Sequence, residues 1–385
     1  MKRIYLDNNA TTPLLPAVLE AMLPYLGESF GNASSIHWQG QQARAAVEAA
    51  REHVAGLVGA RASEIVFTSG GTEGDNLALF GLVKEGDHVV TSTIEHHAVL
   101  NACKRLEGQG VAVTYVNCDR MGRVLPEDVR AALRPETKMI SVMMANNETG
   151  AVQALEEIGK IAGEADVYFH TDAVQAAGKI AIEVERIGCD LLTLAAHKMH
   201  GPQGVGALYV RRGTLLEARQ VGGRHERGRR AGTENLAGIV GFGRAAEWTM
   251  EWFAAGGVEK MRALRERLEE GIRGAVPGTA VNSGEAERVP NTSNLVIEGI
   301  EGEGFVIAMD LKGVSVSTGA ACSSGAIEAS HVLTAMGLTG DEARGSIRFS
   351  LGKQNTAEEV ETVLALVPEV VAKLREMSPV WAGRQ

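Results

Sequence analysis

Short apolar runs alternate with helical stretches through the middle of this 385-residue chain, and this alternation limits its possible folds more than any other feature. The seven runs, rich in β-branched residues, cover residues 64–68, 88–91, 111–116, 139–144, 167–171, 191–195 and 205–210. Strands separated by helices are typical of a mostly parallel sheet. We therefore predict an α/β fold whose large domain is built on a seven-stranded, mostly parallel sheet.

The sequence on either side of these strands divides the chain further. Apolar residues at helical spacing predict a long amphipathic helix over residues 43–57, which Gly59 ends. Later strands are expected at 294–297, 314–317 and 346–350, among helices at 261–272, 304–311 and 356–377. Pro368 is expected to kink or break the last helix. We predict an N-terminal segment (1–15) that packs with the small domain, a large domain (16–255) and a smaller α+β C-terminal domain (256–385).

Charge and composition argue against several classes of protein. The chain has 38 basic and 48 acidic residues, a formal net charge of −10, so direct binding to nucleic acid through a basic surface is not expected. Residues 224–230 are locally basic, but Glu226 interrupts them. No stretch approaches 18 consecutive apolar residues and the N-terminus lacks the apolar core of a signal peptide, so no membrane association is expected.

The chain has four cysteines, Cys103, Cys118, Cys189 and Cys322. They form no CxxC pair and no metal-ligand spacing, so neither a disulfide framework nor a metal site is expected. Unpaired cysteines suit a reducing compartment, and we expect a cytoplasmic protein.

Polar residues follow most of the predicted strands. Residues 69–74, His96, Asn147, Asp172 and Lys198 come after the first, second, fourth, fifth and sixth strands. Each has a structural interpretation by itself, such as a tight turn for 69–74, a helix cap for Asp172 or a solvated side chain for Lys198. In open α/β sheets, however, ligands bind beyond the carboxyl ends of the strands, where these residues would meet. Their convergence therefore predicts a ligand site.

Pyridoxal phosphate requires this set of groups. A lysine forms a Schiff base with its aldehyde, a carboxylate holds its pyridine nitrogen protonated, and an anion site such as the glycine amides and hydroxyl around Thr72 anchors its phosphate. Lys198 follows Asp172 by 26 residues, enough for one strand–helix–strand step that brings both to adjacent strand ends. A nucleotide-binding oxidoreductase is disfavoured, because no GxGxxG motif follows the first strand.

Several longer motifs extend over nearly the whole chain. They are YLDNNATTP at 5–13, FTSGGTE at 67–73, NNETG at 146–150, DAVQ at 172–175, HK at 197–198, ERGRRAGT at 226–233 and SIRFSLG at 346–352. Together they resemble the NifS/IscS family of cysteine desulfurases, which are class V aminotransferase-like pyridoxal-phosphate enzymes of fold type I. The resemblance implies that fold, pyridoxal 5'-phosphate as the cofactor, and a homodimer.

The resemblance also assigns roles to individual residues. Lys198 would be the Schiff-base lysine, Asp172 the partner of the pyridine nitrogen, and His96 a catalytic residue that stacks on the ring and assists proton transfers. The remaining cofactor contacts would be made by Gly71, Thr72 and His197 at the phosphate, Gln175 at the ring hydroxyl, Asn147, and Thr233 from the neighbouring subunit. Asn147 and Arg348 would orient the substrate, Arg348 by a bidentate grip on its α-carboxylate.

Cys322 lies in a run of ten small residues, 317–326. One interpretation is a tight loop with an incidental cysteine. The resemblance implies instead that Cys322 is the catalytic cysteine, which takes sulfur from L-cysteine as a persulfide while L-alanine is released. The sulfur would then pass to an iron–sulfur scaffold or another acceptor protein for the synthesis of iron–sulfur clusters or other thio-cofactors.

One position departs from the family pattern. Many members have a serine two residues before the histidine of the His-Lys pair, where this chain has Ala195, so we expect one phosphate hydrogen bond fewer and weaker cofactor retention. Two alternatives stay open. The chain could catalyse another pyridoxal-phosphate reaction, such as transamination or selenocysteine lysis, or it could be a non-catalytic scaffold in iron–sulfur assembly.

Overall fold

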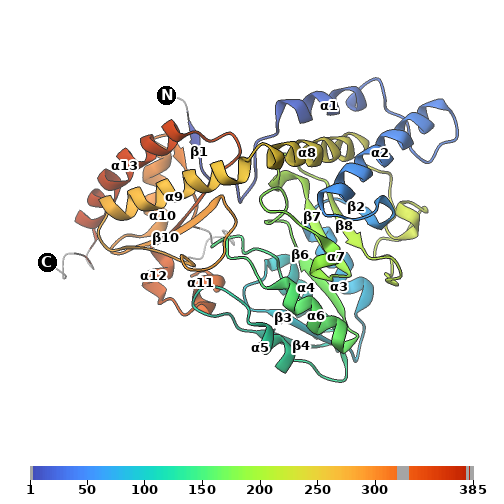
Figure 1. The fold of residues 1–385 in the computed structure, drawn as a ribbon, viewed down its shortest axis with the longest axis horizontal. Coiled ribbons are helices and arrows are strands. Elements are labelled where there is room, and N and C mark those ends of the chain that lie inside the picture. The colour runs from blue at the N-terminus through green and yellow to red at the C-terminus, as the bar shows by residue number, and fades with distance from the viewer. Residues whose placement is uncertain (1–2, 319–328, 379–380, 382–385) are drawn as a thin grey trace.

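The computed structural model describes residues 3–318, 329–378 and 381. Its larger part is built on a seven-stranded sheet with the strand order β2-β8-β7-β6-β5-β3-β4, which confirms the predicted sheet (Figure 1). The strands are β2 (Ile65–Thr68), β3 (His88–Ser92), β4 (Ala112–Val116), β5 (Thr137–Ser141), β6 (Tyr168–Asp172), β7 (Leu191–Ala195) and β8 (Gly206–Val210). Strand β8 is antiparallel to both of its neighbours, and the other strand pairs are parallel.

Both faces of the large sheet are buried. Successive residues of a strand enter two different hydrophobic cores, so that Val89 and Met139 lie in one core while Val90 and Ile140 lie in the other. The first core is closed by α3 (Gly71–Leu82) and α4 (His97–Glu107). The second is closed by α2 (Trp38–Leu57), α6 (Leu155–Ala165), α7 (Val184–Ile187) and α8 (Leu236–Ala254), with α5 (Pro126–Ala131) nearby. Burial on both faces explains why the strands read as short continuous apolar runs.

Helix α8 packs against α2 and against α1 (Pro16–Leu26) beside the large sheet (Figure 1). Two glycines of α8 permit this close approach. A Cβ atom on Gly241 would lie 2.6 Å from the sulfur of Met22, and one on Gly243 would lie 2.6 Å from Cα of Ala50. The helix backbones therefore lie closer together than larger residues would allow.

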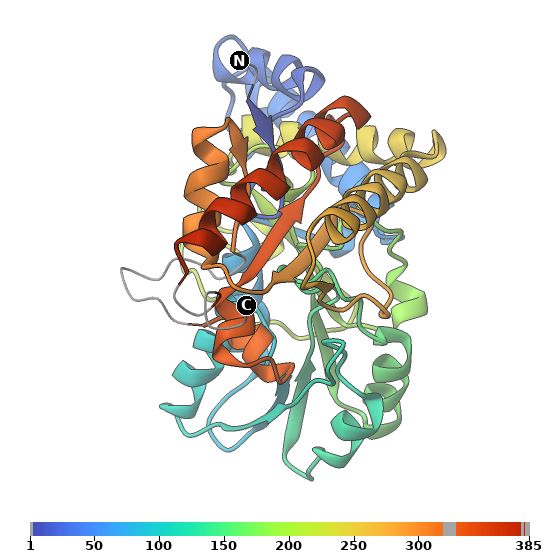
Figure 2. The same cartoon turned by 90° about the vertical axis from the view of Figure 1, so that its left-hand side faces the viewer.

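The smaller part is built on an antiparallel sheet in which β10 (Thr292–Ile297) lies between β9 (Thr279–Val281) and β12 (Ser346–Ser350). Helices α9 (Gly257–Ala275), α10 (Gly302–Leu311) and α13 (Ala357–Glu376) pack against one face of this sheet (Figure 2). At the N-terminus, β1 (Ile4–Tyr5) pairs with β11 (Val314–Ser315), and Ile4 and Leu6 belong to the core of the smaller part. The domain limits at residues 15 and 255 stay predictions.

Some details differ from the sequence prediction. Helix α13 runs through Pro368 without a break, and a capping box of Thr356 and Glu359 begins it. Helices α11 (His331–Ala335) and α12 (Gly340–Arg344) lie late in the chain, yet Val332 and Ala343 pack into a core of the large sheet. Among the described residues, no helix has both the length and the apolar character to cross a membrane.

Candidate active site

A cavity of about 220 Å³ lies at the carboxyl edge of the large sheet. Its walls come from the start of α3, the residue before α4, and the residues at or after the ends of β5, β6 and β7. Eight predicted site residues meet here: Gly71, Thr72, His96, Asn147, Asp172, Gln175, His197 and Lys198. Three residues without a predicted role, Asp75, Met143 and Val174, also line the cavity.

Helix α3 begins at the cavity with Gly71 and Thr72. The backbone N–H groups of a first helical turn lack intrahelical acceptors, and the helix dipole favours an anion there. Gly71 also lies against the turn that follows β6, because a Cβ atom at this position would lie 2.8 Å from Cγ2 of Val174. The start of α3 therefore offers N–H donors and the Thr72 hydroxyl to an anionic group.

Lys198 closes a short 3-10 turn directly after β7. Its Nζ donates to the backbone oxygens of Asn9, at 2.5 Å, and Ala10, at 2.7 Å. Burial and the neighbouring positive charge of Arg348 lower the pKa of Lys198 to about 8. About a tenth of the amine is therefore unprotonated at pH 7, far more than for an ordinary lysine, and the free amine is the form that a nucleophile or a general base requires.

Asp172 is the last residue of β6, and its Oδ1 accepts the N–H of Val174 at 2.9 Å. Burial raises the pKa of Asp172, and the nearby His96 opposes this shift. His96 precedes α4, where its Nδ1 accepts the N–H of Ala98 at 3.1 Å. The neutral imidazole therefore carries its proton on Nε2. Burial lowers the pKa of His96, so the neutral form prevails at physiological pH.

Arg348 lies in β12, outside the set of residues that line the cavity, but its guanidinium contacts the cavity wall. Nη1 donates to the backbone oxygen of Asn147 at 3.0 Å, and Nη2 pairs with Asp7 at 2.7 Å. Within the described part of the chain, Nε of Arg348 is buried and has no hydrogen-bond partner. Arg348 therefore keeps one unpaired donor beside the cavity wall.

Two predicted residues do not join this group. Thr233 lines a separate cavity of about 80 Å³, together with Ser69 and Arg230. Cys322 lies outside the described residues. On one side of that gap the backbone of Ser317 exchanges two hydrogen bonds with Arg348, and on the other Ser330 donates to the Glu148 carboxylate at 2.5 Å.

Asp75 is a site residue that the sequence analysis missed. Its carboxyl is buried, one oxygen has no hydrogen-bond partner among the described residues, and that oxygen lies 3.6 Å from Nε2 of His170. Burial and the charge of Asp172 raise the pKa of Asp75 well above its usual value. The signal was available, because Asp75 follows Gly71 by four residues and so lies on the same face of α3.

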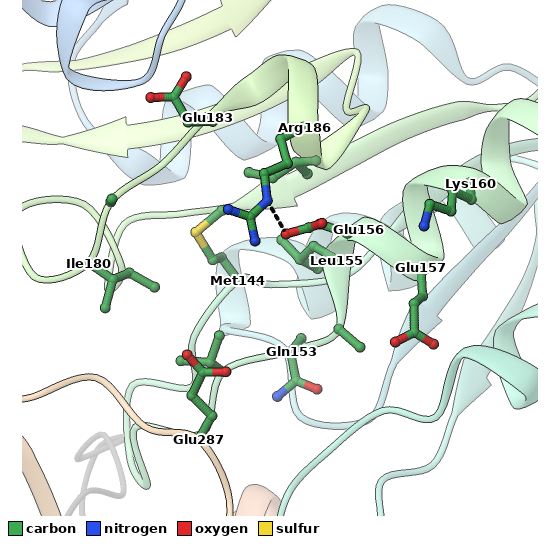
Figure 3. Close-up of a pocket in the computed structure, with 14 residues that line it drawn as sticks. Met144, Gln153, Leu155, Glu156, Glu157, Lys160, Ile180, Glu183, Arg186 and Glu287 are labelled. Carbon is green, nitrogen blue, oxygen red and sulfur yellow. Dashed lines mark ion pairs between the residues drawn. The ribbon is translucent and has the colours of Figure 1, made fainter.

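A larger cavity of about 650 Å³ is lined mainly by the start of α6, by residues of the segment 180–187 that ends with α7, and by Glu287 (Figure 3). Glu156 and Arg186 form an ion pair of 2.6 Å across it, and Glu183, Glu287 and Lys160 contribute further charges. None of the predicted site residues lines this cavity. The smaller cavity is the candidate active site, because the amine, carboxyl and imidazole groups predicted to be functional line it and not the larger one.

The fold and the site define a class of protein. An amine at the end of β7, a buried carboxyl at the end of the adjacent β6 and an anion site at a helix start are the groups by which fold-type-I enzymes hold pyridoxal phosphate. A family described as Aminotransferase class-V matches residues 4–363.

Known proteins narrow this class further. The chain is 52% identical over 385 residues to a cysteine desulfurase IscS of Anaeromyxobacter sp. and 48% identical over 386 residues to one of Methanosarcina thermophila. These matches cover 98% of this chain and 95% and 94% of those proteins. A solved NifS-like protein matches with a TM-score of 0.90 at 37% identity, covering 97% of this chain and 100% of that one. SspA in complex with cysteine matches with a TM-score of 0.81 at 37% identity, covering 92% and 100%. The chain belongs to the class-V aminotransferases, in their NifS/IscS group of cysteine desulfurases.

The enzymes of this family use pyridoxal 5'-phosphate, and the cavity fits that cofactor. Lys198 would supply the amine, Asp172 would supply the carboxyl for the pyridine nitrogen, and Gly71 would allow the close backbone approach at the phosphate. The cofactor prediction made from the sequence is thereby confirmed.

The lowered pKa of Lys198 predicts how cofactor attachment depends on pH. Only the free amine attacks the aldehyde, so the rate constant for rebinding to the cofactor-free enzyme rises about tenfold per pH unit below a midpoint of about 8 and levels off above it. Stopped-flow absorbance over a pH series measures this profile. A midpoint near the ordinary lysine value of 10.5 would contradict the burial argument.

The substitution Ala195→Ser is expected to strengthen cofactor binding. Ala195 is buried, and its Cβ lies 3.8 Å from the place where a Cβ of Gly71 would be, so a hydroxyl there faces the start of α3. One additional hydrogen bond to the phosphate lowers the cofactor dissociation constant roughly fivefold to tenfold. Equilibrium titration of the cofactor-free enzyme measures this change. An unchanged or weaker affinity would show that the position does not contact the phosphate.

Proposed function

We propose that this enzyme converts L-cysteine to L-alanine and holds the released sulfur as a persulfide on Cys322. The observation that supports this most strongly is the placement of Lys198, with its lowered pKa, in one cavity with Asp172 and His96. The relatives that share this architecture over 98% of the chain are named cysteine desulfurases.

In the proposed reaction the cavity residues bind the substrate and move its protons. When bound, pyridoxal phosphate supplies an electron sink for negative charge at the substrate Cα. Arg348 binds the α-carboxylate, and Asn147 helps to orient the substrate. Lys198 Nζ takes the proton from Cα, a role that its pKa of about 8 suits. His96 donates from Nε2 and becomes a proton acceptor once that proton has left.

Cys322 performs the sulfur transfer as a thiolate. Its sulfur attacks the sulfur of the substrate, and a new S–S bond forms while the bond between the substrate's Cβ and sulfur breaks. The electron pair stays with the carbon, which takes up a proton and leaves as alanine. Cys322 follows Ser317 by five residues, a span of up to about 17 Å for an extended chain. The backbone pairing of Ser317 with Arg348 supports access of this cysteine to the site.

We further propose a homodimer in which Thr233 reaches the phosphate of the neighbouring subunit. Large apolar side chains are exposed around α1 and the start of α2, and they include Leu26, Phe30, Ile36 and Trp38. Such a patch suits a protein interface. The sulfur acceptor in this proposal is an iron–sulfur scaffold or another acceptor protein. Free thiols at Cys103, Cys118 and Cys189 suit the reducing cytoplasm.

An assay of the purified holoenzyme tests the proposed reaction. Incubation with L-cysteine and a thiol reductant is expected to yield alanine and sulfide in equal amounts. Amino transfer to a keto acid without sulfide would identify a transaminase, and turnover confined to selenocysteine would identify a selenocysteine lyase. A protein without the yellow absorbance of bound cofactor would instead be a scaffold. Each of these three results contradicts the proposal.

A further inference from the structure

Lys179 is a buried lysine for which the proposed reaction has no role. Only 5% of its surface is exposed, and it follows Gln175 by four residues. Among the residues that the structure describes, no carboxylate forms an ion pair with it, and burial together with the charge of Lys198 lowers its pKa well below the usual value. Burying an amine without a counter-ion costs stability. Its contacts therefore need an explanation.

The amino group of Lys179 contacts two amide oxygens. Nζ donates to Oε1 of Gln175 at 2.7 Å and to Oδ1 of Asn9 at 3.2 Å. The other end of the Gln175 amide, Nε2, donates to the backbone oxygen of Asn9 at 3.0 Å. That same backbone oxygen accepts from Lys198. Lys179 thus lies behind two groups of the candidate active site, the side chain of Gln175 and the anchor of Lys198.

These contacts fix which end of Gln175 is available to a ligand. A backbone oxygen only accepts, so the NH₂ group of Gln175 must face Asn9, and this leaves Oε1 to accept from Lys179. One N–H of Gln175 is taken by Asn9. The second N–H is the remaining donor of this cavity-lining side chain. If Lys179 were absent, Oε1 would be a buried oxygen without a partner, and the amide would reorient to find one.

We propose that Lys179 is a positioning residue that holds Gln175 with its amide N–H toward the ring oxygen of pyridoxal phosphate. The inference rests on the proposed function, in which Gln175 hydrogen-bonds that oxygen. A donated hydrogen bond favours the deprotonated ring oxygen, which is the form that absorbs in the yellow. Lys179 acts only through Gln175 and has no contact of its own with substrate or cofactor in this proposal.

A double-mutant cycle on the holoenzyme tests this proposal. The variants are Lys179→Met, Gln175→Ala and the double substitution. Two quantities are measured, the ratio of yellow to near-ultraviolet absorbance and the dissociation constant of pyridoxal phosphate. Each single variant is expected to lose yellow absorbance and to bind the cofactor roughly tenfold more weakly. The double variant is expected to match Gln175→Ala alone, because Lys179 then has nothing left to position.

Conservative and matched variants separate positioning from a general structural role. Lys179→Gln, whose NH₂ can donate to the same oxygen, is expected to keep the wild-type spectrum. Lys353→Met removes a half-buried lysine that contacts Thr249 and two tryptophan rings, and is expected to leave the spectrum unchanged. If Lys179→Met does not fold, Lys179→Ala takes its place with the same expected shift.

The outcomes distinguish this proposal from the proposed function. An unchanged spectrum and affinity in the Lys179 variants, or losses that add in the double variant, would overturn the positioning role while wild-type alanine formation stays intact. If instead the wild-type protein from the same preparation forms no alanine from cysteine, the proposed function fails, whatever the spectra show.

Discussion

Lys198→Ala is expected to abolish alanine formation from L-cysteine. The substitution removes both the covalent attachment of the cofactor and the base that takes the proton from Cα, and loss of the general base alone lowers rates by about two to four orders of magnitude. Lys198 is the only lysine among the described residues that line the cavity, so no neighbouring lysine can replace it there. Assays of alanine and of cofactor absorbance measure both losses.

Lys160→Ala serves as the matched control. Lys160 is an exposed lysine of α6 that lines the larger cavity, so its loss is expected to leave alanine formation and cofactor absorbance unchanged. Alanine formation by Lys198→Ala within tenfold of the wild-type rate would mean that another group carries out the proton transfer. The assignment of the active site to the smaller cavity would then be wrong.

Cys322→Ala is expected to separate cofactor chemistry from sulfur transfer. The cofactor groups lie on the large sheet and do not include Cys322, so the yellow absorbance stays at its wild-type level. Removal of the nucleophile lowers sulfide and alanine formation by at least roughly a thousandfold. Absorbance spectra and product assays on one preparation compare the two effects directly.

Cys118→Ala is the control for this experiment. Cys118 is a half-buried free cysteine, and burial raises the pKa of its thiol to about 11, so it is almost entirely in the unreactive thiol form at neutral pH. Its loss is expected to leave all activities intact. Sulfide formation at the wild-type rate by Cys322→Ala would assign the sulfur transfer to another group.

The sequence predicted the large sheet well because burial on both faces turns its strands into continuous apolar runs. It did not predict α8, where three glycines within six residues resemble a loop. Two of them, Gly241 and Gly243, instead allow neighbouring helices to approach, a relationship that only the folded structure contains. Pro368 was expected to kink or break α13. The helix is unbroken, and its residues Val367 and Val371, on either side of the proline, pack in the core of the smaller part.

The site was predictable where its residues follow strands. Asp172 and Lys198 could be placed together because the carboxyl ends of parallel strands share one edge. Asn9 and Lys179 could not be placed there from the sequence, because their contacts join the N-terminal segment to a turn more than 150 residues later in the chain.

The locally basic segment 224–230 also has contacts that the sequence did not predict. Glu226 forms a buried bidentate pair with Arg51, and this pairing anchors residues that looked like a charged surface.

Mass spectrometry of the peptide that contains Cys322 tests the central claim most directly. The holoenzyme is incubated with L-cysteine in the absence of reductant, its free thiols are blocked, and the digested peptides are compared with those of an untreated sample. One additional sulfur atom on Cys322, lost on treatment with a thiol reductant and absent from Cys103, Cys118 and Cys189, is the predicted result. An unmodified Cys322 thiol in enzyme that has formed alanine would contradict the account.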